Sequence, residues 1–331
     1  MTARTSLVRC LALAACLLPL AVQAYSASVL TRAGAGVSVI GAPGSTEHQP
    51  AERSASTTKP EPLNLSNAAY ALTTNAQYTA SATGHSFASV SPGLVSVFAS
   101  GQGTGTASPP TYSQSDSTGY GYASGGFADS MTLNVAGVAA GALVWVDFSV
   151  RFEGTAGVTR TAVAGGWAQG GNDYHWGLQI TSPGWGAGTL YNSGTRTYQV
   201  DVNGNVTFNT LQFGAQPMGA WLMTGTPLGL NAWAWAQAFG RGGYSYCPSG
   251  CTDQMAGVAY SFMDASHTLA WNGVQGVKLA DGSAVDLAGV SLWSETGLNL
   301  MQPVTSVPEP MSAVLLALGL SVLYVARRRR A

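Results

Sequence analysis

Apolar and polar residues alternate with a period of two along most of this chain. The pattern is clearest in ALVWVDFSVRF, residues 142–152. One face of this segment carries Val144, Val146, Phe148, Val150 and Phe152, and the opposite face is a mixture of polar and apolar residues. Such alternation is typical of strands with one buried face. It recurs at residues 78–82, 86–90, 131–135 and 197–202, and no stretch of residues 25–306 has the period of an amphipathic helix. The pattern predicts a mostly β protein, with a single antiparallel β-sandwich or jelly-roll-like domain.

Glycine and short polar runs mark where strands are expected to end. Asn203-Gly204 and Asp281-Gly282 suit tight turns, and we assign the 42 glycines mainly to such turns. Residues 45–62 are rich in charge and proline, residues 100–119 are rich in Gly, Ser and Thr, and both have the composition of loops. The predicted organisation is a flexible segment at residues 25–66, with one short strand at 38–40, followed by the sandwich at residues 67–306.

The first 24 residues have the layout of a secretory signal peptide. Two arginines precede an apolar run at residues 10–22, and Ala24 closes the segment with a small residue. A charged start, an apolar centre of about 13 residues and a small-residue exit define such signals. The alternative is a lipoprotein signal cleaved before Cys16, which would leave only a short apolar run. We therefore expect residues 25 onward to cross the inner membrane through Sec-type export machinery.

The last 25 residues combine three features in a fixed order. Val307, Pro308, Glu309 and Pro310 come first, the uncharged segment 311–326 follows, and the basic tail 327–331 holds Arg327, Arg328, Arg329 and Arg330. As a helix, segment 311–326 would span about 24 Å, close to the ~30 Å hydrocarbon core of a bilayer. Basic residues stay on the cytoplasmic side and so determine the topology. We expect an inner-membrane-anchored precursor with residues 25–306 in the periplasm.

Taken together, Pro308-Glu309-Pro310, the short apolar helix and the terminal arginines resemble the PEP-CTERM sorting signal of Gram-negative bacteria. The resemblance covers residues 307–331 only. It implies that an exosortase recognises and processes the tail, and that the mature protein is then released or attached at the cell surface. Proteins with this tail are associated with exopolysaccharide and biofilm. The two prolines also remove backbone donors and favour an extended segment, which suits an enzyme's groove.

The region between the termini carries little charge. Residues 25–306 hold 8 of the 14 Lys and Arg residues and 14 of the 15 Asp and Glu residues, which gives a net charge of −6. Binding of nucleic acid requires clustered basic residues, and this region has none, so we exclude it. Two cysteines remain there, Cys247 and Cys251. In an oxidising compartment they are expected to form one small disulfide loop.

No pattern in this region predicts a catalytic centre. The four histidines lack metal-ligand spacing, no Gly-x-Ser-x-Gly elbow occurs, and the glycine-rich runs do not complete a phosphate loop. We therefore expect no metal and no cofactor. A glycoside hydrolase needs two carboxylates. Asp147 with Glu153, and Asp264 near His267, are the candidates, and both sets are better explained as solvated strand ends and turns.

Tryptophan gives the strongest hint of a binding surface. All nine tryptophans lie between the termini, and three fall within residues 167–185. Flat aromatic rings with a polar edge can stack on sugars. Candidate carbohydrate contacts are therefore Trp167, Tyr174, Trp176 and Trp185, with Asn172, Asp173 and His175 beside them. The alternative is that most tryptophans fill the core of the sandwich.

Three functions stay open at this point. The leading one is a non-enzymatic cell-surface or matrix protein, sorted by its tail and associated with exopolysaccharide. The second is a polysaccharide-binding module, and the third is a secreted polysaccharide hydrolase. The residues do not choose among them.

Overall fold

The computed structural model describes residues 24–40, 47–74, 77–108, 114–163, 165–182, 189–200, 205–209, 214–245 and 253–304. They form fifteen strands and a single 3-10 turn, η1 (Leu287–Gly289). All strand pairs are antiparallel. No helix in these ranges is both long and apolar enough to cross a membrane. The prediction of a mostly β, antiparallel protein is confirmed.

The first sheet has eight strands. Its hydrogen-bonded order is β11-β10-β9-β13-β6-β1-β2, with β15 paired to β6. The bounds are β1 (Ser26–Ile40), β2 (Glu47–Thr57), β6 (Gln114–Val135), β9 (Gly166–Thr181), β10 (Thr189–Val200), β11 (Val206–Asn209), β13 (Pro227–Tyr244) and β15 (Val290–Ser294).

The second sheet has seven strands. Its order is β12-β7-β14-β5-β4-β3, with β8 paired to β14. The bounds are β3 (Leu63–Thr74), β4 (Tyr78–Ser91), β5 (Leu94–Ala107), β7 (Leu143–Phe152), β8 (Thr155–Val163), β12 (Gly214–Met223) and β14 (Met255–Lys278).

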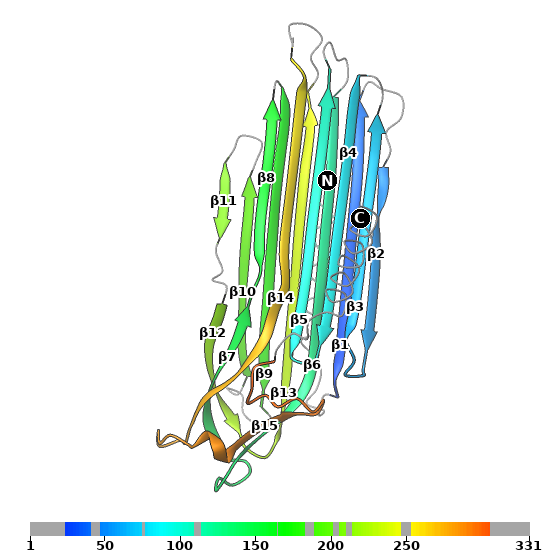
Figure 1. Cartoon of the computed structure of the whole chain (residues 1–331). Coiled ribbons are helices and arrows are strands. Elements are labelled where there is room, and N and C mark those ends of the chain that lie inside the picture. The colour runs from blue at the N-terminus through cyan, green and yellow to red at the C-terminus, as the bar shows by residue number, and fades with distance from the viewer. Residues whose placement is uncertain are drawn as a thin grey trace, which may run out of the picture.

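The long strands run side by side along one axis, and η1 and β15 lie at one end of the molecule (Figure 1). The sheets face each other, since β4, β5 and β14 of the second sheet contact β1, β6 and β13 of the first. Consecutive strands form two meanders, β3-β4-β5 and β9-β10-β11. This order differs from the paired Greek keys of a jelly roll.

Two segments predicted as flexible are strands, so those predictions were wrong. Within residues 25–66, β1 lies between β6 and β2 and pairs with β6 over its whole length, while β2 and β3 form sheet edges. Residues 100–107 belong to β5 and residues 114–119 to β6. The physical reason is small-residue packing. Alternate residues of β1, such as Ala33 and Ala35, are buried although they are too small to give a strong hydrophobic pattern.

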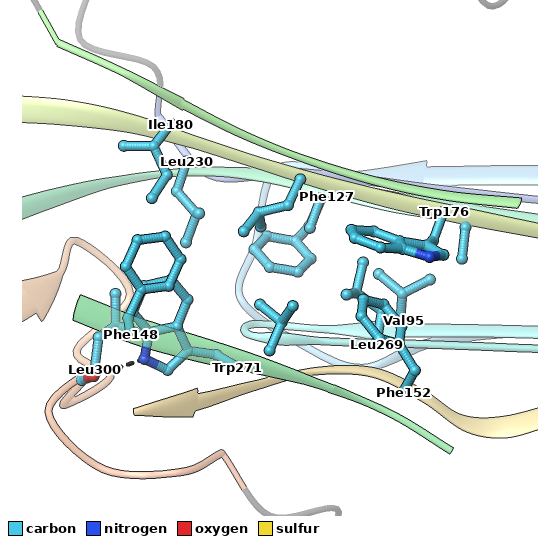
Figure 2. Close-up of a cluster of buried hydrophobic side chains, with 14 of the residues drawn as sticks. Val95, Phe127, Phe148, Phe152, Trp176, Ile180, Leu230, Leu269, Trp271 and Leu300 are labelled. Atoms are coloured by element: carbon cyan, nitrogen blue, oxygen red, sulfur yellow. Dashed lines mark hydrogen bonds between the residues drawn. The ribbon is translucent and has the colours of Figure 1, made fainter. Parts of the chain in front are cut away.

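The half of the sandwich near β15 has a core of large side chains. Figure 2 shows Phe127, Trp176, Ile180 and Leu230 pointing from one layer toward Val95, Phe148, Phe152, Leu269 and Trp271 of the other. Phe152 and Trp176 meet across the sheets with ring centroids 4.0 Å apart. Trp271 Nε1 donates a 2.6 Å hydrogen bond to the carbonyl of Leu300, which ties the C-terminal segment to this core. The predicted buried face of residues 142–152 is confirmed.

Beyond this core the sheets are packed by glycine, and a second, smaller cluster that includes Tyr244 and Met255 lies farther along the strands. A Cβ added at Gly242 of β13 would lie 2.5 Å from the carbonyl oxygen of Gly257 and 2.6 Å from that of Gly103, both in the facing sheet. The same holds for Gly101, Gly103, Gly119 and Gly121, where an added Cβ would overlap main-chain oxygens. The backbones of the two sheets therefore touch. The assignment of glycine mainly to turns was wrong for these inward positions.

The two predicted turns have different outcomes. Asp281-Gly282 is a turn, with Gly282 at φ +85° and Leu279 donating to the carbonyl of Ser283. β10 and β11 form the other predicted hairpin, but Val200 lies opposite Val206. A two-residue Asn203-Gly204 turn would place Val200 opposite Thr207. The turn residues themselves lie outside the described residues.

Candidate functional site

The outer surface of the eight-stranded sheet carries a concentration of aromatic side chains. Strands β6, β9 and β13 alternate buried and half-buried residues, and the half-buried set faces away from the second sheet. This surface, here called the aromatic face, comprises Tyr120, Tyr122, Trp167, His175, Trp233, Trp235 and Phe239.

Strand register arranges most of these rings in four successive rows. Tyr120 lies opposite Phe239, Tyr122 opposite Gln237, and Trp235 opposite His175. Trp233 occupies the fourth row, between glycines on both neighbouring strands. Each row is two residues from the next, so the stripe extends about 20 Å along the strands.

Three of the rings lie over glycine. Tyr120 is opposite Gly34, Trp167 is opposite Gly243, and Trp233 is opposite Gly177. In each pair, the ring is the nearest side chain to the position that a Cβ on the glycine would occupy. Glycine lacks a side chain to pack, and a cross-strand aromatic covers its backbone. One face of each ring is used in this way.

Three further rings form a ladder across the strands. His175 of β9 stacks on Trp235 of β13 with centroids 4.1 Å apart and planes 18° apart. Tyr122 of β6 lies 5.9 Å from Trp235 on its other side. The guanidinium of Arg32 on β1 stands 5.9 Å from the centre of the Tyr122 ring. Aromatic rings are thus continuous across β9, β13 and β6, and Arg32 of β1 extends the stack by one cation.

Charged residues on this face are paired with one another. Arg32 Nε donates to Glu52 at 2.6 Å, and Asp173 lies 3.4 Å from His175, a contact that is an ion pair only when the imidazole is protonated. Arg241 contacts both carboxylate oxygens of Asp116 and also stands over the Trp167 ring, 5.1 Å from its centre. The surface therefore offers aromatic rings, of which Trp235 is stacked between His175 and Tyr122, more than free charge.

The tyrosines of the stripe keep their hydroxyl protons at neutral pH. Burial raises the pKa of Tyr122 above its usual range, although Ser124 and Arg32 act in the opposite direction. Burial likewise raises the pKa of Tyr120. Both hydroxyls are therefore able to donate as well as accept hydrogen bonds.

The structure separates the predicted carbohydrate contacts. Trp167 lies on the aromatic face, and so do Asp173 and His175. Tyr174 and Trp176 are 0 % and 3 % exposed and point into the core, so predicting them as contacts was wrong. Adjacent positions of a strand face opposite sides, which no ligand can reach together. Asn172 is also buried, and Trp185 lies outside the described residues.

The expectation that most tryptophans fill the core was also wrong. Of the eight within the described residues, only Trp176 and Trp271 are buried. Sequence reasoning missed Tyr120, Tyr122, Trp233 and Trp235 as surface candidates. The available signal was the pattern GYGY at residues 119–122 and WAW at 233–235, where large rings alternate with very small residues.

Other predicted sites lie elsewhere or beyond the description. The sorting motif, the arginines 327–330 and both cysteines are outside the described residues. Within the described part, no group of three or more potential metal ligands occurs. Asp147 and Glu153 are six residues of extended chain apart, about 20 Å. That exceeds the separation of about 5 to 9.5 Å found in glycosidases.

Comparison with known proteins adds no relative. No family model matches this chain, and neither a curated protein nor a solved structure matches it. The site is therefore interpreted from its own geometry.

Proposed function

We propose that this chain is a non-enzymatic, exported surface protein that binds polysaccharide through the aromatic face. The observation that carries the proposal is the stripe of rings at Tyr120, Tyr122, Trp235 and Trp233. Sugars present apolar C–H faces that stack on aromatic planes, and hydroxyls that need donors and acceptors at the edges. A stripe of about 20 Å suits an extended chain of sugars rather than a small enclosed ligand.

The polar surroundings support the same ligand class. Gln237 and Asp173 lie beside Tyr122 in one row, and Gln179 lies two residues beyond Gly177 on β9. Such groups can exchange hydrogen bonds with hydroxyls at the edges of the stacked rings. Because the neighbouring charges are paired, stacking rather than net charge would provide most of the affinity.

The test is a double substitution, Trp233→Ala with Trp235→Ala. Removing two stacking surfaces should weaken binding to polysaccharide at least tenfold, which corresponds to about 1.4 kcal/mol. The measurement is retardation in native gels containing exopolysaccharide from the host, followed by a glycan array. Trp221→Ala is the matched control because Trp221 packs against Trp145 on the other sheet. Equal retardation of wild type and double variant would rule out the aromatic face.

Delivery of the protein is a separate part of this proposal. The tail, with Pro308-Glu309-Pro310 and arginines 327–330, supports sorting by an exosortase after export and transient anchoring in the inner membrane. Mass spectrometry should find a C-terminus upstream of Arg327 on the surface form in the native host, and an intact tail in an exosortase-deficient strain. An intact Arg330-Ala331 terminus on the surface form would contradict sorting but leave polysaccharide binding untouched.

A further inference from the structure

A hollow of about 440 Å³ lies at the end of the sandwich that carries η1 and β15. It is bounded by the last part of β14 and by residues 287–303. It shares no residue with the aromatic face. This volume falls within the range of small-molecule sites, about 300 to 1,000 Å³.

The polar part of the lining consists of four carboxamides, Asn272, Gln275, Asn299 and Gln302. Three of them make hydrogen bonds within the fold, of which that from Gln275 Nε2 to the carbonyl of Asn272 is the longest, at 3.4 Å. Asn272 Nδ2 donates to Ser149 Oγ at 2.8 Å, and Asn299 Oδ1 accepts from the backbone N–H of Met301 at 3.1 Å. These bonds fix both amides and leave Asn272 Oδ1 and Asn299 Nδ2 as an acceptor and a donor for a ligand.

The remaining lining is mainly apolar. Val274 and Val290 are buried, and Met301, Leu287 and Pro303 complete the apolar surface. No charged side chain lines the hollow. The carboxamides can hydrogen-bond to uncharged hydroxyls, and the apolar floor can contact C–H groups. The lining therefore suits a molecule that has hydroxyls on one side and C–H groups on another.

An exposed tryptophan stands next to the hollow. Trp293 of β15 forms an isolated antiparallel bridge with Asn299 and is 48 % exposed. Directly opposed residues in such a bridge have Cβ atoms about 4.5 to 5.5 Å apart. Trp293 is therefore a neighbour of the lining residue Asn299 and does not itself line the hollow.

We propose that this hollow is a second binding site, which takes a single neutral sugar unit such as the end of a glycan chain. The carboxamides bind neighbouring hydroxyls, because each hydroxyl both donates and accepts. The apolar floor meets the C–H face of the ring. The absence of lining charge favours neutral sugars over uronic acids or amino sugars with a free amine.

The test uses the whole protein and small probes. D-glucose, D-galactose, D-mannose and N-acetylglucosamine are titrated to 50 mM while the Met301 methyl signal is followed by NMR, assigned with Met301→Leu. At least one neutral sugar should shift this signal in a saturable way. Gln302→Ala combined with Gln275→Ala should weaken that binding at least fivefold, and Asn64→Ala, an exposed amide on β3, should not change it.

The inference would be overturned if no neutral sugar gave a saturable shift, or if the double variant bound as well as the wild type. Stronger binding of glucuronate or of an acetylated tripeptide than of any neutral sugar would also overturn it. The Trp233→Ala and Trp235→Ala variant should keep this site, so loss of polysaccharide binding by the aromatic face and failure of the hollow are distinguishable.

Discussion

At the scale of single residues, glycine has two separate roles in this protein. Gly93 and Gly282 adopt positive φ angles in turns, as composition predicts. Gly103 and Gly242 instead lie in regular strands where the facing backbone leaves no room for a side chain. The sequence does not distinguish these roles, because the second depends on which strands come to face each other.

Two alanine substitutions in β13 should separate the roles of space and conformation. Gly242→Ala forces the sheets apart and should lower the free energy of unfolding by about 1 to 3 kcal/mol. Gly229→Ala lies in the same strand with its nearest atoms at 3.6 Å, so it should be neutral or stabilise by about 0.5 to 1 kcal/mol. Chemical denaturation measures both. Equal effects would show that the sheets are not in backbone contact.

Asp147 gives a prediction about pH. Its carboxylate accepts a 2.6 Å hydrogen bond from Trp145 Nε1 and lies 3.2 Å from Lys278 Nζ. The hydrogen bond from Trp145 is the main cause that holds the pKa of Asp147 below its usual value, and Lys278 adds to it. Trp145→Phe should therefore raise this pKa toward about 3.9, the value in unfolded chains.

The sign of the stability effect follows from the lowered pKa. The folded state binds this proton less readily, so the carboxylate contributes stability above about pH 4 and loses it as pH falls through the lowered pKa. The side chain is 37 % exposed, so the contribution stays below about 1 kcal/mol. Carbon-13 NMR titration of the carboxyl group measures the shift. Trp221→Phe should leave the pKa unchanged, and an unchanged pKa in Trp145→Phe would refute the assigned cause.

At the scale of elements, strands with large alternating side chains were predictable and strands of small residues were not. β7 shows the first case, because Val144, Phe148 and Phe152 give a strong period-two signal. β1 shows the second, since half of its burial involves alanine and glycine. A composition rich in Ala, Gly and Ser resembles a linker until a facing sheet of equally small residues is known.

Hydrogen exchange should reveal β1 as a central strand. Both of its edges are paired, to β6 and to β2. Both pairings cover residues 27–36, so the amides there should exchange at least about a thousandfold more slowly than unstructured peptide. Alternate amides of the edge strand β3 provide the internal comparison, because only one of its sides is paired. Rapid exchange throughout residues 26–40 would instead support the prediction that this segment is flexible.

At the scale of the whole molecule, the fold class was predictable but the location of the site was not. Period two and turn residues indicate antiparallel sheets without naming the neighbours of any strand. The aromatic face requires β6, β9 and β13 to be adjacent, and these strands are separated in the chain by up to about a hundred residues. Trp167 was selected on proximity in sequence, and its buried neighbour Trp176 was selected wrongly for the same reason.

The response to salt tests how the whole surface binds. Arg32 and Arg241 on the aromatic face are paired with carboxylates, and residues 25–306 have a net charge of −6. Binding by stacking should change less than about twofold between 50 and 500 mM NaCl, whereas exposed charge interactions are strongly screened in that range. Titration calorimetry with the host polysaccharide measures it. A tenfold loss would show that charge, not stacking, supplies the affinity.

The contact of backbone with backbone in the glycine-packed part has a consequence for how this protein can diversify. At Gly101, Gly103, Gly119 and Gly242 even one added methyl group would meet a main-chain oxygen, so these inward positions are closed to larger residues. This contact involves no outward side chain, so outward residues can change with little effect on it. New ligand preferences could therefore arise by substitution of surface rings and amides while the backbone contact between the sheets is kept.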